Sequence, residues 1–129
     1  MQEKNLTSQV KFPDYISYNQ LPILLNQALA LVFPSLWEGF GLPVLEAMGC
    51  GTPVITSNLA SLPEVTGDAA ILVSPYHTQE ITAAMASIFT DSGLRNTLTQ
   101  QGLARASQFS WSKTGTATAQ ILEEILCTD

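Results

Sequence analysis

The chain has 129 residues, of which 46% are hydrophobic and 12% are charged, a balance typical of one globular domain rather than of a disordered segment. The 11 acidic and 5 basic residues give a formal net charge of -6, which argues against nucleic acid or an anionic membrane as a partner, because both require a basic face. The two cysteines, Cys50 and Cys127, lie far apart, and no apolar run reaches membrane-spanning length, so we expect a reduced, cytoplasmic protein without a transmembrane segment.

The first predicted elements are a short strand at Val10 to Phe12 and a helix that follows it. Ser17 can cap this helix, with Gln20 three residues later as in a capping box. The helix is expected to pack on a sheet through apolar residues at helical spacing, which are Leu21, Leu24, Leu25, Ala28 and Leu29. The apolar run from Ala28 to Phe33 then predicts a buried strand.

A glycine-rich loop follows this strand and leads into another helix. The loop holds Glu38 and the run Gly39-Phe40-Gly41, and the helix continues from Pro43 to Met48. Glycines let the backbone turn sharply and approach a bound group, while the start of a helix offers unpaired N–H groups and the positive end of a dipole. In parallel sheets such a loop lies at the carboxyl edge, where ligands bind. We therefore expect it to bind an anion or a polar ligand.

Two carboxylates accompany this loop, Glu38 within it and Glu46 about one turn into the helix, so both can face the same crevice. Together with the amides they suit a ligand that carries a phosphate and several hydroxyls, because amides bind phosphate and carboxylates accept hydrogen bonds from hydroxyls. The alternative interpretation is that Glu38 is a solvated loop residue and Glu46 a favourable charge in the first helical turn.

Further strands are predicted after this helix, which Gly49-Cys50-Gly51 can end. Pro53 to Thr56 is apolar on both faces, as in an interior parallel strand. A short helical turn around Pro63-Glu64-Val65 and a strand from Ala70 to Val73 follow. Four strands with helices between them predict an α/β fold with a Rossmann-like parallel sheet and flanking helices.

The last part of the chain is predicted to be helical, in segments from Thr78 to about Phe89, from Asp91 to Ala106 and from about Lys113 to Cys127. Trp111 is expected to fill the junction before the last helix. The apolar face of that helix is formed by Ala117, Ile121, Leu122, Ile125 and Leu126. Because contiguous apolar patches usually mark contacts, we expect this face to fold back on the sheet or to pair with another chain.

The run PSLWEGFGLPVLEAMGCGTPVITS, residues 34 to 57, resembles the signature of group 1 retaining glycosyltransferases of the GT-B fold, a Glu, seven residues and a Glu in the donor-sugar domain. The segment FPDYISYNQLPILLNQA before it, SLPEV and GDAA after it, and Phe109-Ser110-Trp111 resemble further family landmarks. The resemblance covers nearly the whole chain from Val10 onward. It implies that residues 1–129 form a single domain, part of the C-terminal, nucleotide-sugar-binding domain of such an enzyme.

The resemblance also implies roles for residues of the signature. Glu38 would contact hydroxyls of the donor sugar, and Glu46 would bind the ribose hydroxyls of the nucleotide. Backbone amides for the sugar and diphosphate would come from Gly39, Phe40, Gly41 and Leu42. The family transfers a sugar from a nucleotide-diphosphate sugar with retention at the anomeric carbon, and typically needs no metal ion. The sequence fits this, since it has no His, Cys and carboxylate cluster with ligand spacing.

Parts of the family's site are expected to lie upstream of this chain, namely an Arg and Lys pair that neutralises the diphosphate and the acceptor domain. Since positive groups usually stabilise a leaving diphosphate, we expect no catalysis by this chain alone. A companion chain with the missing half would complete the site, and a homo-oligomer is the other partner that we expect. The alternative is a non-catalytic nucleotide-sugar-binding or assembly module. A glycosidase that uses Glu38 and Glu46 is disfavoured, because both lie on one glycine loop rather than on opposing walls.

Overall fold

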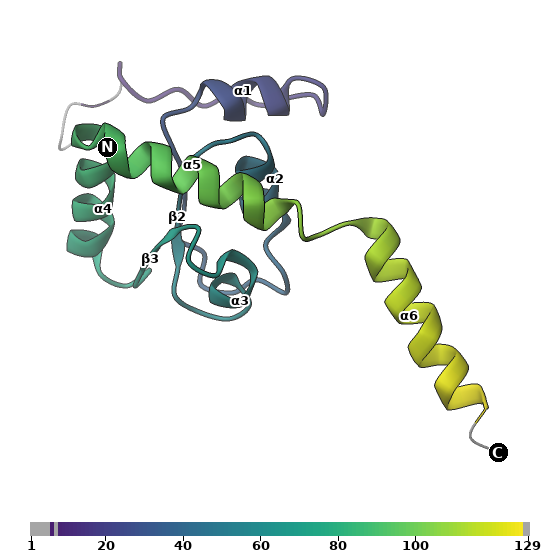
Figure 1. The fold of residues 1–129 in the computed structure, drawn as a ribbon. Coiled ribbons are helices and arrows are strands. Elements are labelled where there is room, and N and C mark those ends of the chain that lie inside the picture. Colours follow the sequence, from purple (N-terminus) through teal and green to yellow (C-terminus); the bar gives the residue numbers. More distant parts are fainter. Residues whose placement is uncertain (1–5, 7, 128–129) are drawn as a thin grey trace.

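Figure 1 shows the computed structural model, which describes residue 6 and residues 8–127. Three strands form a parallel sheet in the order β1-β2-β3, and their bounds are Leu31–Phe33, Val54–Ser57 and Ile71–Val73. β2 is the central strand, and all four of its residues are buried, as predicted for an interior strand. The predicted α/β fold with a parallel sheet and flanking helices is confirmed.

Six helices lie in the part of the chain that the structure describes. The first three are α1, α2 and α3, which span Leu21–Gln27, Leu42–Gly49 and Leu62–Thr66. The last three are α4, α5 and α6, which span Thr78–Thr90, Ser92–Ala106 and Trp111–Leu126. Figure 1 shows α1 to α5 gathered around the sheet, whereas α6 points away from them. The folded body is therefore built from β1 to β3 and α1 to α5.

The buried core lies on both faces of the sheet. Val54 of β2 belongs to one buried cluster with Met48 of α2. Ile55, its neighbour in β2, belongs to the other with Ile88 of α4 and Leu98 of α5. Successive side chains of a strand point to opposite faces, so β2 contributes to both clusters. A central strand buried in this way explains why its apolar pattern is continuous rather than alternating.

α2 is fixed in place by α5 and α1. Gly102 of α5 lies against Met48 of α2. A Cβ added at Gly102 would lie 3.3 Å from the Cγ of Met48. The hydroxyl of Thr99 donates to the carbonyl of Gly51 at 3.0 Å, and that of Thr52 donates to the carbonyl of Leu25 at 2.7 Å. These contacts hold the C-terminal end of α2, so the position of its opposite end, at the glycine loop, is also determined.

The strand predicted at Val10 to Phe12 is wrong. These residues are irregular and exposed, and Phe12 is 73% exposed. A strand is stabilised by hydrogen bonds to a neighbouring strand, and none lies beside this segment among the described residues. The described sheet therefore has three strands instead of four. The strand predicted from Ala28 begins only at Leu31, because α1 continues to Gln27.

The capping box predicted at Ser17 is also wrong. The helix begins at Leu21, and the Ser17 hydroxyl donates to Oε1 of Gln20 at 2.9 Å instead of accepting a backbone N–H. Of the apolar residues predicted to face the sheet from this helix, only Leu25 is buried, while Leu24 is exposed. α1 therefore packs on the body along a narrower stripe than its sequence predicts.

Trp111 does not fill the junction before the last helix, because its side chain is 79% exposed. It is the first residue of α6, and the hydroxyl of the preceding Ser110 accepts the Lys113 N–H at 3.2 Å, which caps the helix. No residue of α6 is buried against the described chain. The expectation that its apolar face folds back on the sheet is therefore wrong, and pairing with another chain stays a prediction.

α4 begins with a small network around Glu80. The Glu80 carboxylate accepts the Ser74 N–H at 2.8 Å and lies 2.8 Å from Nδ1 of His77. The hydrogen bond from Ser74, followed by the contact with His77, lowers the pKa of Glu80 below its ordinary value of 4.5. Because the pKa is lower in the folded chain than in the unfolded one, the stabilisation is present above the unfolded value and is lost as the pH falls through the folded value.

We expect the Glu80 carboxyl carbon to titrate below 4.5 in a nuclear magnetic resonance experiment on the folded chain. Glu80→Gln should remove the corresponding loss of stability on acidification, since the amide does not titrate. Glu123→Gln, on the exposed helix α6, is the matched control and should leave that pH dependence in place. A Glu80 midpoint at or above the ordinary value would contradict the network.

Candidate functional site

The glycine loop, residues 34 to 41, lies at the carboxyl end of β1. Its first part is ordered by Ser35, whose hydroxyl donates to Oε1 of Glu38 at 2.9 Å. Glu38 is half-buried. The carboxylate is thus held inside its own loop rather than free in solvent, which argues against reading it as a fully solvated residue.

The segments at and after the end of β2 also contact β1 and the glycine loop. The hydroxyl of Ser61, which lies after β2, is 2.9 Å from the carbonyl oxygens of both Glu38 and Phe40. At the strand ends themselves, the Thr56 hydroxyl donates to the Phe33 carbonyl at 2.8 Å. Carboxyl ends of parallel strands meet at one edge of a sheet, and the segments that follow β1 and β2 are joined here as that rule predicts.

Gly41 makes the turn from the loop into α2. Its φ of 103° and ψ of 44° lie in the left-handed region, which glycine adopts at little cost. A Cβ at this position would lie 2.6 Å from Cδ2 of Leu62, which is fully buried. Gly39 differs, since a Cβ there would meet no atom within 4 Å. Pro43 lies in the first turn of α2, where a missing N–H is tolerated, as predicted.

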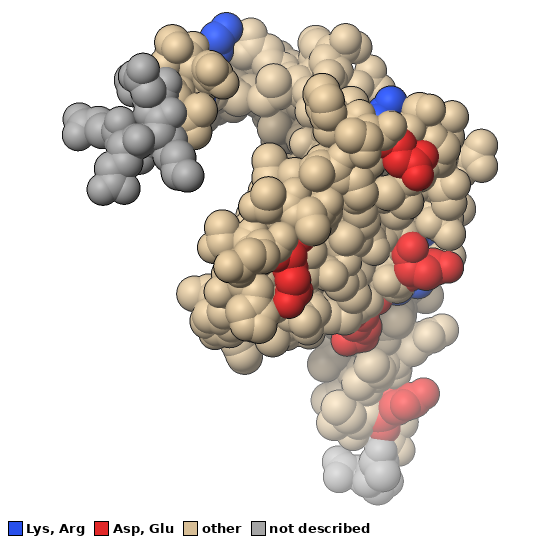
Figure 2. All heavy atoms as spheres, turned by 90° about the vertical axis from the view of Figure 1, so that its left-hand side faces the viewer, with Lys and Arg blue, Asp and Glu red and all other residues tan. Residues whose placement is uncertain are grey.

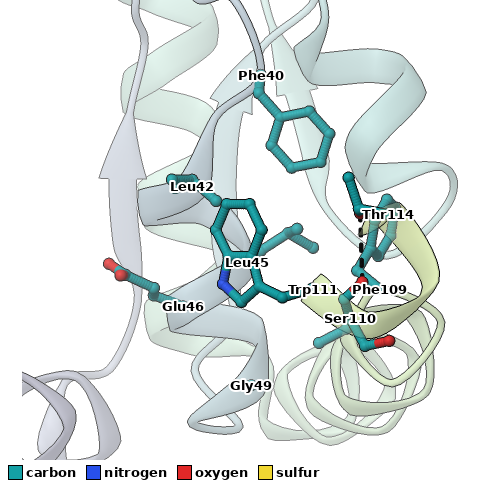
Figure 3. Close-up of a pocket in the computed structure, with 10 residues that line it drawn as sticks. Phe40, Leu42, Leu45, Glu46, Gly49, Phe109, Ser110, Trp111 and Thr114 are labelled. Atoms are coloured by element: carbon teal, nitrogen blue, oxygen red, sulfur yellow. Dashed lines mark hydrogen bonds between the residues drawn. The ribbon is translucent and has the colours of Figure 1, made fainter. Parts of the chain in front are cut away.

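An open cavity of about 480 Å³ lies between α2 and the start of α6 (Figure 3). Most of the side chains around it are apolar. Its lining consists of Phe40, Leu42, Leu45, Glu46, Gly49, Ala106, Phe109, Ser110, Trp111 and Thr114. In Figure 3 the indole of Trp111 lies next to α2, and the carboxylate of Glu46 points away from the aromatic rings. The cavity therefore offers apolar and aromatic walls with one carboxylate at its rim.

The cavity gathers part of the predicted site. Phe40, Leu42 and Glu46 line it, whereas Glu38 and the two loop glycines do not. The sequence predicts that Glu38 and Glu46 face one crevice, but only Glu46 lines this cavity. Glu46 is exposed at the cavity rim, and Glu38 is half-buried in the loop.

Positive charge is missing from the lining of this cavity, which includes no Lys or Arg. The guanidinium of Arg105 is engaged by the carbonyls of Glu64 and Val65, and that of Arg95 by the carbonyls of Ile88 and Phe89. Figure 2 shows another part of the surface, where carboxylates are spread out with few basic side chains among them. An anion in this cavity would therefore meet no Lys or Arg side chain of its lining.

The described residues contain no group of three or more His, Cys, Asp or Glu that could hold a metal ion. The expectation that no metal takes part stays a prediction. In the same part of the chain, no helix is both long and apolar enough to cross a membrane.

Sequence reasoning did not single out three residues around the glycine loop, which are Ser61, Arg105 and Phe109. Arg105 gave no signal, because an isolated Arg fits any solvated surface, and Ser61 belongs to the SLPEV landmark, whose role the sequence did not indicate. Phe109 belongs to the Phe-Ser-Trp landmark, whose role the sequence did not indicate. In the structure its ring lies 5.9 Å from that of Phe40, centroid to centroid, in an edge-to-face arrangement.

Comparisons with known proteins show the family of this chain. A family described as "Glycosyl transferases group 1" matches residues 1–105. The O-antigen chain mannosyltransferase B of Escherichia coli is 44% identical over 109 residues, which cover 84% of this chain and 29% of that protein. The MMP alpha-(1->4)-mannosyltransferase of Mycolicibacterium hassiacum is 36% identical over 115 residues, covering 86% of this chain and 28% of that protein.

A solved structure shows the same fold. The sucrose-phosphate synthase of Thermosynechococcus elongatus superimposes with a TM-score of 0.89 at 30% identity, covering 99% of this chain and 33% of that chain. The three parallel strands and their helices thus match a Rossmann-like C-terminal domain of a GT-B glycosyltransferase. The chain spans 29% or less of the length of the curated relatives named here. With the family matching most of its residues, the chain belongs to the group 1 glycosyl transferases.

Proposed function

We propose that this chain supplies the donor-binding half of an enzyme that transfers a sugar from a nucleotide-diphosphate sugar to an acceptor. The observation that carries the proposal is that Phe40, Leu42 and Glu46, all from the family signature, line one cavity at the start of α2. The left-handed Gly41 brings the loop to that helix start, where N–H groups and the dipole favour an anion. The diphosphate would bind there.

The two carboxylates suit the hydroxyl groups of such a donor. Glu46 is exposed at the cavity rim, where it can accept hydrogen bonds from the ribose hydroxyls. Glu38 is held by Ser35 in the loop and would accept from hydroxyls of the sugar. Retention at the anomeric carbon is part of the proposal and rests on the family resemblance alone.

The sugar is proposed to be mannose. Two of the relatives described above are mannosyltransferases by name, and a serotype-specific mannosyltransferase of Escherichia coli is 41% identical over 107 residues. Glucose is the alternative, since a glycogen synthase of Mycobacterium tuberculosis is 34% identical over 114 residues. A binding experiment should therefore compare the mannose and glucose derivatives of each nucleotide.

Catalysis is proposed to need residues beyond those described. Charge develops on the leaving diphosphate in the transition state, and preorganised positive groups usually stabilise it. The cavity lining has no Lys or Arg to do so. The same observation favours the second candidate function, a binding or assembly module without activity. The two candidates are distinguished by whether a basic pair supplied by another segment or chain restores transfer.

Glu46→Ala should weaken nucleotide-diphosphate binding tenfold or more, because a hydrogen bond to a charged group contributes about 1.5–3 kcal/mol and about 1.4 kcal/mol is tenfold. The measurement is calorimetry or ligand-observed nuclear magnetic resonance with UDP, GDP and ADP, and with their glucose and mannose derivatives. Glu123→Ala is the matched control, since it removes an exposed helical carboxylate outside the cavity.

Equal binding by the Glu46→Ala and Glu123→Ala variants would show that Glu46 does not contact the nucleotide. No binding of any of these ligands by the unaltered chain at millimolar concentration would count against donor binding by these 129 residues. The first result would move the search to other residues of this chain, and the second to residues outside it.

We also propose that another polypeptide covers α6, either a second copy or a companion chain. Ile121, Leu122 and Ile125 are each more than half exposed. Size-exclusion chromatography with light scattering at micromolar concentration should show self-association, and Ile125→Glu should abolish it. Gln120→Glu, on the opposite side of the helix by its spacing, should leave it unchanged. A monomer throughout would exclude the second copy.

The cytoplasmic location expected from the sequence stays a proposal. Cys50 and Cys127 are both free thiols in the structure, which suits a reducing compartment.

A further inference from the structure

Gly39 is an exposed residue of the glycine loop. A Cβ there would meet no atom within 4 Å, so neighbouring side chains do not restrict the backbone at this residue. The carbonyl of Glu38, directly before Gly39, and that of Phe40, in the peptide that precedes Gly41, both lie 2.9 Å from the hydroxyl of Ser61. The single proton of the Ser61 hydroxyl can be donated to either carbonyl or shared between them, so Ser61 restrains the loop around Gly39.

The side chain of Phe40 is held from a second direction. The ring of Phe109 lies edge-to-face against it, with centroids 5.9 Å apart and an angle of 79° between the planes. This is a favoured geometry for aromatic pairs. Phe109 follows α5, so the ring pair connects the loop after β1 to a segment about seventy residues further along the chain.

Arg105 connects this aromatic pair to α3. Its Cζ lies 5.1 Å from the centroid of the Phe109 ring. Its Nε donates to the carbonyl of Val65 at 2.9 Å, and its Nη2 donates to the carbonyl of Glu64 at 2.6 Å. α3 follows Ser61 directly. The glycine loop thus contacts Phe109, Phe109 contacts Arg105, and Arg105 contacts α3. Ser61, directly before α3, contacts the glycine loop again.

We propose that Arg105 and Ser61 are positioning residues that hold the glycine loop in the conformation that binds the donor diphosphate. Neither side chain lines the cavity, so they act through Phe109 and the loop carbonyls rather than by touching the ligand. The effect on donor binding rests on the proposed function, whereas the restraint on the loop does not. The two can therefore be tested separately.

Arg105→Gln should loosen the loop in the absence of any ligand. Backbone amide order parameters of Gly39, Phe40 and Gly41 should fall from the rigid range of about 0.85 to below about 0.6. Arg95→Gln is the matched control, because Arg95 lies on the same helix and donates to the carbonyls of Ile88 and Phe89 at the end of α4. It should leave the loop order parameters unchanged.

Two further variants separate positioning from charge and from misfolding. Arg105→Lys keeps the charge but loses the planar fork that reaches two carbonyls, so it should also lower the order parameters. Ser61→Ala removes a single oxygen and should do the same, while Ser87→Ala removes a comparable hydroxyl, bonded to the Ala84 carbonyl, and should not. Affinity for GDP and UDP should fall at least about tenfold in the three loop-restraint variants, an effect of about 1.4 kcal/mol.

Unchanged loop order parameters in both Arg105→Gln and Ser61→Ala would overturn the proposal. If the order parameters fall but the unaltered chain binds no nucleotide diphosphate, the restraint is supported and the proposed function fails. If the order parameters fall and the affinity for GDP and UDP does not, these contacts hold the loop without contributing to donor binding. The positioning role is then overturned.

Discussion

Gly41→Ala should lower the free energy of unfolding by about 1–3 kcal/mol, the usual cost of a strained backbone residue. Two independent effects add here. The φ of 103° is unfavourable for any residue with a Cβ, and the added Cβ would lie 2.6 Å from Cδ2 of Leu62. Because Leu62 is fully buried, its side chain has little room to move away. The loop should be displaced as well, so nucleotide binding should be lost with the stability.

Urea unfolding followed by circular dichroism measures this cost, and Gly39→Ala is the control. The two glycines lie in one loop, but a Cβ at Gly39 meets nothing within 4 Å. We therefore expect that variant to stay within about 0.5 kcal/mol of the unaltered chain, as surface substitutions usually do. Equal losses in the two variants would show that the left-handed turn at Gly41 is not required.

Met48→Ala should lower the free energy of unfolding by about 2–5 kcal/mol, because it removes a buried side chain and leaves a cavity. Met48 is 0% exposed and belongs to the buried cluster between α2 and the sheet. Its side chain also lies against Gly102 of α5, where an added Cβ would be 3.3 Å from the Met48 Cγ. Helix α2 should therefore lose its support from two directions at once.

Met85→Ala, in α4, is the matched control for this prediction. Its side chain is 50% exposed, so truncation removes fewer contacts and leaves no closed cavity. Both variants replace Met by Ala inside a helix, so differences in helix propensity cancel. A loss of stability in Met48→Ala no larger than in Met85→Ala would contradict the assignment of Met48 to the core.

Local patterns predicted most of the sheet and its neighbouring helices. The continuous apolar run at β2, the glycine and proline around the start of α2 and the break at Asp91 each depend on a few adjacent residues, and the structure has the corresponding elements there. The predicted strand at Val10 to Phe12 failed for the opposite reason. An extended segment becomes a strand only beside a partner, and sequence alone does not reveal whether a partner is present.

The candidate site was also predicted only in part. The signature pattern predicted that Glu38 and Glu46 face one crevice, and in the structure Glu46 lines the cavity whereas Glu38 does not. The contact between Arg105 and the Glu64 carbonyl joins residues 41 positions apart and depends on how α5 packs beside α3. Trp111 was misplaced because a large aromatic side chain suggests burial, whereas its position at the start of α6 leaves it exposed.

Helix α2 packs on the core with one side and borders the cavity with another. Val44 and Met48 point into the core and are 0% exposed, whereas Leu42 and Glu46 are exposed and line the cavity. The 3.6-residue period of the helix keeps the two sets apart. Libraries that vary only the cavity side can therefore search for altered ligand selectivity with little loss of foldable sequences, whereas randomising the whole helix would discard most of its members as unfolded.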